Sequence, residues 1–159
     1  MADKGVKTNV MRLLDSRGVD YVSRDYSHTG AVSGADVARV LGLDPQSVFK
    51  TLVTVGASGE HYVFMIPVEQ ELDLKKAARA VGEKSVGMIR QRELFPLTGY
   101  VHGGCSPIGM KKTFVTVVDE TAQLFDTVTF SAGRIGFQVE LSPAALSTLI
   151  PLTYADLCE

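Results

Sequence analysis

Two neighbouring stretches of the chain have the pattern of hydrophobic residues that is typical of buried β-strands. They comprise residues 48–55 and 61–68, and the five residues between them, which include two glycines, have the length and composition of a hairpin loop. Residues 85–89 form a shorter candidate strand, and four more stretches have a strand-like pattern, namely 19–26, 114–118, 127–131 and 135–141. The six longer stretches predict about six strands, and the short one at 85–89 is a further candidate.

Other stretches have apolar residues three or four positions apart, a spacing that predicts helices. Residues 8–17 and 74–81 show this spacing, and a glycine follows each of them. Three more helices are expected: one between Ser33 and Gly42, one at 90–95 that Pro96 ends, and one that begins at Ser142-Pro143. No ordered βαβ repeat is visible, so a doubly wound parallel sheet is not favoured.

These elements predict a single mixed α/β (α+β) domain over residues 1–159, with a mixed, mostly antiparallel sheet flanked by four or five helices. The 159 residues, 45% of them hydrophobic, are enough for one domain with its own core. No apolar run approaches the roughly 20 residues that cross a bilayer, and the N-terminus lacks the apolar segment of a signal peptide. Cys105 and Cys158 are the only cysteines. The chain is therefore expected to work in a reducing cytosol, without a membrane.

Charge is distributed unevenly along the chain. The net charge is −2, yet residues 75–112 contain eight basic and two acidic residues, a local sum of +6. Such a segment can form a positive face on an acidic body and bind a polyanion. It can equally be a solvated helix surface, and charge alone does not separate the two.

A lysine interrupts the apolar stretch 48–55. Lys50 shares one side of the predicted strand with Val48 and Leu52, because side chains alternate along a strand. If this side faces the interior, the ammonium group is partly removed from water and needs an anionic or oxygen partner. If it faces solvent, Lys50 is an ordinary strand lysine.

The second candidate site is the loop at residues 103–109, which contains three glycines and a proline. Because glycine has no side chain, main-chain N–H groups of such a loop can approach a ligand oxygen and bind an anion or oxyanion. The same composition is common in a long turn between strands. No Gly-Lys-Ser/Thr sequence follows, so it is not a Walker loop.

Nucleophiles and metal ligands are scarce in the sequence. Cys105 lies in this loop three residues after His102, which allows a thiol nucleophile or a small space-filling side chain, and no cysteine-protease signature surrounds it. His28, His61 and His102 have no acidic or cysteine partner at ligand spacing, so no metal site is predicted. There is no Gly-x-Ser-x-Gly elbow either, which argues against a serine hydrolase.

Taken together, several segments resemble the YbaK/EbsC family, which is similar to the editing insertion domain of bacterial prolyl-tRNA synthetase. The resemblance runs along nearly the whole chain and rests on residues 41–43, 48–52, 72–76, 98–109, 111–112, 131–134 and 140–141. It implies a trans-editing enzyme that removes cysteine from mischarged proline tRNA beside prolyl-tRNA synthetase, without a metal or cofactor.

The resemblance also implies roles for particular residues. Lys50 matches the essential lysine near the terminal adenosine and the scissile ester. Gly103 to Pro107 match a Gly-x-x-x-Pro loop whose main chain holds the aminoacyl carbonyl. The substrate pocket is then expected to involve Tyr26, Gly103, Gly104, Ser106, Pro107, Ser131 and Gly133. The lysines assigned to the tRNA backbone are Lys75, Lys76, Lys111 and Lys112.

Two positions depart from the family pattern. Cys105 stands where relatives commonly have an aliphatic residue, so we expect that it is not required, and Gln138 stands where some relatives have an acidic residue. In the mechanism that the resemblance implies, the thiol of the bound cysteine attacks its own ester carbonyl. The alternatives are an alanyl-tRNA or broader deacylase of the same fold, a non-catalytic module that binds tRNA or a synthetase, and a cysteine-dependent small-molecule hydrolase.

Overall fold

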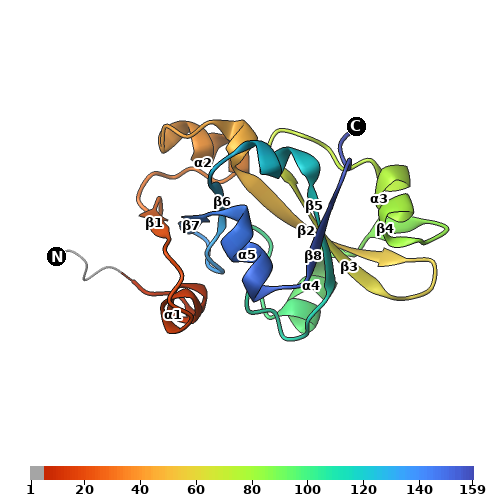
Figure 1. Ribbon diagram of the computed structural model, residues 1–159. Helices are drawn as coiled ribbons and strands as arrows, with labels where there is room; N and C mark the ends of the chain where they lie inside the picture. The colour runs from red at the N-terminus through yellow and green to blue at the C-terminus, as the bar shows by residue number, and fades with distance from the viewer. Residues whose placement is uncertain (1–5) are drawn as a thin grey trace.

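The computed structural model describes residues 6–159, which form two β-sheets with helices around them (Figure 1). The three-stranded sheet has the order β1-β7-β6, with β1 (Val22–Asp25), β6 (Val128–Ser131) and β7 (Phe137–Leu141). The five-stranded sheet has the order β4-β2-β3-β5-β8, with β2 (Phe49–Gly56), β3 (His61–Pro67), β4 (Val86–Met88), β5 (Val115–Asp119) and β8 (Leu152–Ala155).

Five α-helices and two short 3-10 helices connect the strands. The α-helices are α1 (Asn9–Ser16), α2 (Gly34–Val40), α3 (Leu74–Val81), α4 (Gln91–Thr98) and α5 (Pro143–Leu149), and the 3-10 helices are η2 (Pro45–Ser47) and η3 (Glu120–Leu124). Most α-helices begin where a side-chain oxygen accepts a hydrogen bond from an N–H of the first turn, as at Thr8, Ser33, Asp73 and Ser142.

The two faces of the five-stranded sheet pack against different neighbours. On one face, Phe64 and Ile66 of β3 contact α3 and Leu157 near the C-terminus. On the other face, Phe49 and Met65 join a larger core with α1, α5 and the inner side of the three-stranded sheet. Each of these large side chains stabilises the fold by about 1.5–3 kcal/mol when it is fully buried. The five-stranded sheet is therefore the central layer.

One edge of β2 connects the two sheets. β4 pairs with this edge at residues 54–56, and Val48, immediately before β2, forms a parallel bridge with Thr129 of β6. Between these contacts, residues 50–52 have no strand partner on this edge in the part of the chain that the structure describes. β6 ends beside this gap, so the turn that follows β6 starts next to the first half of β2.

The mixed, mostly antiparallel arrangement predicted from the sequence is confirmed, since four of the six strand pairings are antiparallel. The structure differs in having two sheets and eight strands where one sheet of about six was expected. The sequence pattern missed β8, which is a half-buried edge strand of four residues directly after Pro151. Its parallel partner β5 lies more than thirty residues away, so no local signal marks it.

The prediction that Pro96 ends a helix was wrong. α4 continues through Pro96 to Thr98. The Thr98 hydroxyl donates to the Leu94 carbonyl at 2.8 Å, and the Gly99 N–H donates to the Phe95 carbonyl at 2.8 Å. These bonds close the last turn despite the missing proline N–H, and Gly99 supplies the left-handed conformation that ends the helix.

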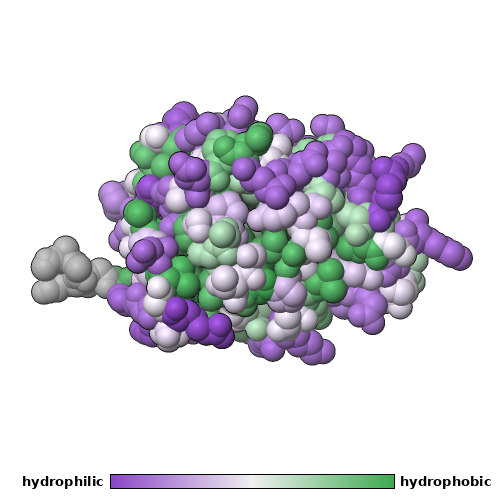
Figure 2. All heavy atoms as spheres, viewed as in Figure 1, coloured by the Kyte–Doolittle hydropathy of each residue, from purple (hydrophilic) through white to green (hydrophobic). Residues whose placement is uncertain are grey.

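The surface on the side of α5 is mixed in character. Hydrophilic residues gather along the upper edge and at the right of this view, and apolar residues form a broken band across the middle (Figure 2). In residues 6–159 every helix is too short or too polar to cross a bilayer.

Candidate functional site

Lys50 is the second residue of β2 and lies opposite Ile66 of β3. Its side chain is half-buried, intermediate between the two environments that the sequence left open. Within residues 6–159, the Lys50 ammonium group takes part in no ion pair and no hydrogen bond. An ammonium group that has no protein partner can bind an anion or a carbonyl oxygen.

Ser131, the last residue of strand β6, lies level with Lys50 of strand β2. Val48 and Thr129 are bridged in parallel, and Lys50 and Ser131 each follow two residues later. Because side chains alternate, Lys50 and Ser131 extend from the side that Val48 and Thr129 share. The Ser131 oxygen accepts a hydrogen bond from the Gly133 N–H at 3.1 Å, so it also shapes the turn between β6 and β7.

The glycine-rich loop packs directly on this turn. A Cβ atom at Gly104 would lie 3.0 Å from the Ile135 nitrogen and 3.4 Å from two main-chain carbons of Arg134. A Cβ at Gly103 would contact the Ile135 side chain. Glycine at position 104 thus permits the backbone of the loop to approach the backbone of residues 134–135 closely. The turn at 131–135 thereby connects the strand that carries Lys50 to the loop at 103–109.

Two adjacent main-chain N–H groups in the loop have no partner. The Gly104 N–H donates to the Val101 carbonyl at 3.0 Å, and the Ile108 N–H donates to the Ser106 hydroxyl at 3.3 Å. The N–H groups of Cys105 and Ser106 donate to no other group in residues 6–159, although Cys105 is 8% exposed and Ser106 0%. Buried N–H groups are rarely left unpaired, so these two are candidate donors to a ligand oxygen.

Tyr100 holds the loop and the turn together, a role that no pattern in the sequence indicated. Its hydroxyl donates to the Ile108 carbonyl at 2.5 Å. A Cβ at Gly133 would lie 2.9 Å from the Tyr100 ring, so the ring packs flush against the turn. Gly133 has φ +89°, which also favours glycine. Gly133 is more than thirty residues from Tyr100, so no local sequence pattern signals this contact.

Tyr26 lies just after β1 and is 6% exposed. Its N–H donates to the Gly136 carbonyl at 2.7 Å, which continues the pairing of β1 with β7. Alternation places the Tyr26 ring on the same side as Arg24 of β1, and the pairing of β1, β7 and β6 makes this the side of Ser131. Lys50, Tyr26 and Ser131 are thus on one side of the two sheets, and the glycine loop contacts the turn that follows Ser131.

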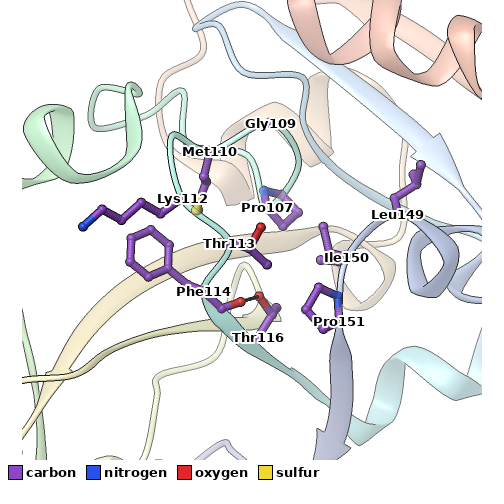
Figure 3. A pocket seen from close by; sticks show the side chains of 10 residues that line it. All are labelled: Pro107, Gly109, Met110, Lys112, Thr113, Phe114, Thr116, Leu149, Ile150 and Pro151. Carbon is purple, nitrogen blue, oxygen red and sulfur yellow. Dashed lines mark hydrogen bonds between the residues drawn. The ribbon is translucent and has the colours of Figure 1, made fainter.

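Pro107 lines a cavity next to the glycine loop (Figure 3). This cavity has a volume of about 210 Å³, and Ile150 and Pro151 form its opposite wall. A second cavity of about 380 Å³ lies beside η3 and the C-terminal residues. Neither cavity is lined by Lys50, Ser131 or Gly104. The first cavity therefore shares only Pro107 and Gly109 with the glycine loop, and the second shares no residue with it.

Comparison with known proteins identifies this arrangement. A model of the aminoacyl-tRNA editing domain matches residues 28–149. The chain belongs to the aminoacyl-tRNA editing domain family. The resemblance indicated by the sequence motifs is confirmed.

Individual relatives agree with this family. The protein EbsC of Enterococcus faecalis, provisionally named a Cys-tRNA(Pro)/Cys-tRNA(Cys) deacylase, is 43% identical over 95% of this chain and 93% of its own length. The proline–tRNA ligase of Pelobacter propionicus is 33% identical over 54% of this chain, which corresponds to 15% of the ligase. A crystal structure provisionally described as a trans-editing enzyme for prolyl-tRNA synthetase superposes with a TM-score of 0.83 at 26% identity, covering 98% of this chain and 99% of that one.

The thiol of this editing domain is placed away from the lysine. Cys105 packs with Val53 and Val63, whose side chains are on the opposite face of the five-stranded sheet from Lys50. Burial raises the pKa of the Cys105 thiol to about 12, so the thiol stays protonated at neutral pH. The structure therefore gives Cys105 a packing role in the core beneath the loop. Within residues 6–159 no group of three or more His, Cys, Asp and Glu side chains is arranged to hold a metal ion.

The four lysines expected to contact tRNA do not form one patch. Lys75 and Lys76 are on α3, which covers one face of the five-stranded sheet, whereas Lys111 and Lys112 follow the loop that packs on the other face. The Lys76 ammonium group is already paired with Asp156 at 3.0 Å and with the Cys158 carbonyl at 2.7 Å. The Lys111 ammonium group lies 5.2 Å from the centre of the Phe95 ring. Lys75 and Lys112 are exposed.

We expect Cys105 to resist alkylation in the folded protein. With the pKa raised to about 12, fewer than about one thiol in ten thousand is ionised near pH 7.5, and the thiolate is the reactive form. Iodoacetamide treatment followed by mass spectrometry should leave Cys105 unmodified in the native protein and modify it in urea.

A folded Cys105→Ala variant should keep most of its deacylation rate, and a loss of about 100-fold or more would restore the covalent hypothesis.

We expect Tyr100→Phe to destabilise the protein by about 1–3 kcal/mol, because it leaves the buried Ile108 carbonyl without a hydrogen bond. The free energy of unfolding in urea measures this effect. Tyr154→Phe is the matched control, since the Tyr154 hydroxyl has no hydrogen-bond partner in residues 6–159. Equal stabilities of the two variants would mean that the Tyr100 hydroxyl does not hold the loop.

Proposed function

We propose that this protein is a trans-editing deacylase that hydrolyses the ester of mischarged Cys-tRNA(Pro). Its family, and the 43% identity to EbsC over nearly the full length of both chains, support this substrate class. The structural observation that carries the proposal is the position of Lys50. Its unpartnered ammonium group is level with Ser131, whose turn packs on the loop that contains two free N–H groups.

These groups are suited to an ester that needs orientation and charge stabilisation. The N–H groups of Cys105 and Ser106 can donate to the ester carbonyl, where negative charge develops during attack. Lys50 supplies a positive charge that holds the phosphate or sugar oxygens of the terminal nucleotide. An aminoacyl ester is already activated, so holding it in a reactive geometry supplies much of the acceleration.

The nucleophile in this proposal comes from the substrate. Cys105 is protonated and faces the core, and the sequence contains no serine-hydrolase elbow. In the proposed step the cysteine sulfur bonds to its own ester carbonyl carbon, the bond from that carbon to the ribose oxygen breaks, and the thiol proton passes to the departing ribose oxygen. Water then opens the cyclic thioester and releases free cysteine.

The need for such an enzyme follows from the similar sizes of cysteine and proline. A synthetase pocket gains only about 1–3 kcal/mol of discrimination per methylene-sized difference, so a separate hydrolytic step raises accuracy. We place this step in the cytosol, beside prolyl-tRNA synthetase. Lys75, Lys111 and Lys112 are exposed, and we assign these three lysines to the tRNA backbone. Contacts this sparse require a synthetase to select the tRNA.

The proposal is tested by a panel of charged tRNAs. We expect the protein to deacylate Cys-tRNA(Pro) faster than Ala-tRNA(Pro) or Ser-tRNA(Pro) by about tenfold or more, since only cysteine carries a thiol for the proposed attack. Cys-tRNA(Cys) tests whether the protein discriminates between tRNAs. Preferred release of alanine would support the alternative specificity. Binding of tRNA in a gel shift without any deacylation would identify a non-catalytic module.

We expect Lys50→Met to lower kcat/KM for Cys-tRNA(Pro) by about 100-fold or more, because the substitution removes the positive charge that holds the terminal nucleotide in place. The methionine keeps the apolar stem, so the melting temperature should change little. Lys84→Met is the control, because Lys84 is an exposed lysine to which we assign no contact with tRNA. Full activity of Lys50→Met would exclude Lys50 from the mechanism.

A further inference from the structure

A row of polar side chains extends from β1 across the three-stranded sheet to β2. Arg24 of β1 is in register with Gln138 of β7, and Gln138 is in register with Ser131 of β6. Lys50 continues the row, because it lies level with Ser131. Partners in register point to the same side of a sheet, so these four side chains share one surface.

Two atoms in this row are buried without a partner. Gln138 is 6% exposed, and its Oε1 atom has no hydrogen bond in residues 6–159. Arg24 uses Nη2 for an ion pair with Glu140 at 2.5 Å, while its Nη1 atom is buried and unpaired. Thr51 has the third such atom, and its side chain is on the opposite face of β2 from Lys50. Leaving a buried polar group unpaired is costly, so two on facing residues point to a missing partner.

The chemistry of the two atoms specifies that partner. Arg24 Nη1 can only donate a hydrogen bond, and Gln138 Oε1 can only accept one. Directly paired residues of an antiparallel sheet have Cα atoms about 4.5–5.5 Å apart, so a single group can contact both side chains. A carboxylate or phosphate dianion cannot donate to Gln138, and an ammonium group cannot accept from Arg24. An O–H group satisfies both.

We propose that Arg24 and Gln138 bind one O–H group at the substrate ester. This proposal rests on the proposed function, because the row ends at Lys50, where the terminal nucleotide of the tRNA is placed. The O–H group has two possible sources, namely the free 2′-hydroxyl of the terminal ribose and an ordered water molecule. In either case the pair fixes the position of an oxygen next to the reacting carbonyl.

The test uses Gln138→Met, which removes the acceptor while keeping the length of the side chain. Gln123→Met is the control, because Gln123 is an exposed glutamine on η3. Kinetics are measured with Cys-tRNA(Pro) that ends in adenosine and with the same tRNA ending in 2′-deoxyadenosine. We expect Gln138→Met to lower kcat/KM for the first substrate by about tenfold or more while its melting temperature stays the same or rises. If Gln138 had only a structural role, Gln138→Met would instead lower the melting temperature.

The two substrates separate the sources of the O–H group. If the ribose hydroxyl is bound, kcat/KM of the wild-type protein is about tenfold lower with the 2′-deoxy substrate than with the ordinary one. The kcat/KM of Gln138→Met is then the same with both substrates. If water is bound, kcat/KM of Gln138→Met is lower than that of the wild-type protein by the same factor with both substrates. Activity of Gln138→Met within about twofold of wild type on both substrates would overturn the proposal.

Two further measurements keep the result independent of the folding of one variant and of the proposed function. Arg24→Lys retains a cation for Glu140 but lacks Nη1, so it should reproduce the pattern of Gln138→Met. A crystal structure of the wild-type protein should show an oxygen atom within hydrogen-bond distance of both Arg24 Nη1 and Gln138 Oε1. A direct Arg24–Gln138 hydrogen bond there would contradict the inference, whereas failure of wild type to deacylate any tRNA would refute only the proposed function.

Discussion

The candidate site depends on one main-chain contact, the parallel bridge between Val48 and Thr129. It joins β6 to the edge of β2 that β4 does not cover, and so makes the two sheets continuous at this point. Every spatial relation around Lys50 follows from it, because alternation then puts Lys50 beside Ser131. The core provides the rigidity, since Phe49 and Phe130, which neighbour the bridge in sequence, are both buried in one apolar cluster. A shift of register by one residue would turn Lys50 away from Ser131.

A second constraint is the close packing of the glycine loop on the turn at 131–135. Gly104 permits the contact, and Tyr100 fixes it from the other side by packing on Gly133 and donating to the Ile108 carbonyl. The loop thereby keeps two N–H groups unpaired, although the residues that carry them are buried. Leaving buried donors unpaired costs stability, and such a cost is commonly found at functional sites.

The sequence predicted those elements whose signals are local. The hairpin of β2 and β3 has apolar runs around a short glycine-containing link, and helices with a capping Ser or Asp began where expected. Features that depend on distant pairing were not predictable, because their signals are spread over the chain. β8 pairs with β5 from more than thirty residues away, and Arg24 meets Gln138 from more than a hundred. For the same reason Lys50 could be selected as a candidate, while its relation to Ser131 required the fold.

The distribution of unpaired groups explains how a site without a nucleophile of its own can carry out hydrolysis. Its one thiol is buried and protonated, on the far face of the sheet from Lys50. In residues 6–159, the groups of this site without a hydrogen-bond partner include the donors of Lys50, Arg24 and the loop N–H groups and the acceptor of Gln138. Such a set cannot attack an ester, but it can hold one in a single geometry and stabilise the charge that forms on its carbonyl oxygen. The reactivity must then come from the substrate or from water, so that selectivity depends on which aminoacyl group brings its own nucleophile.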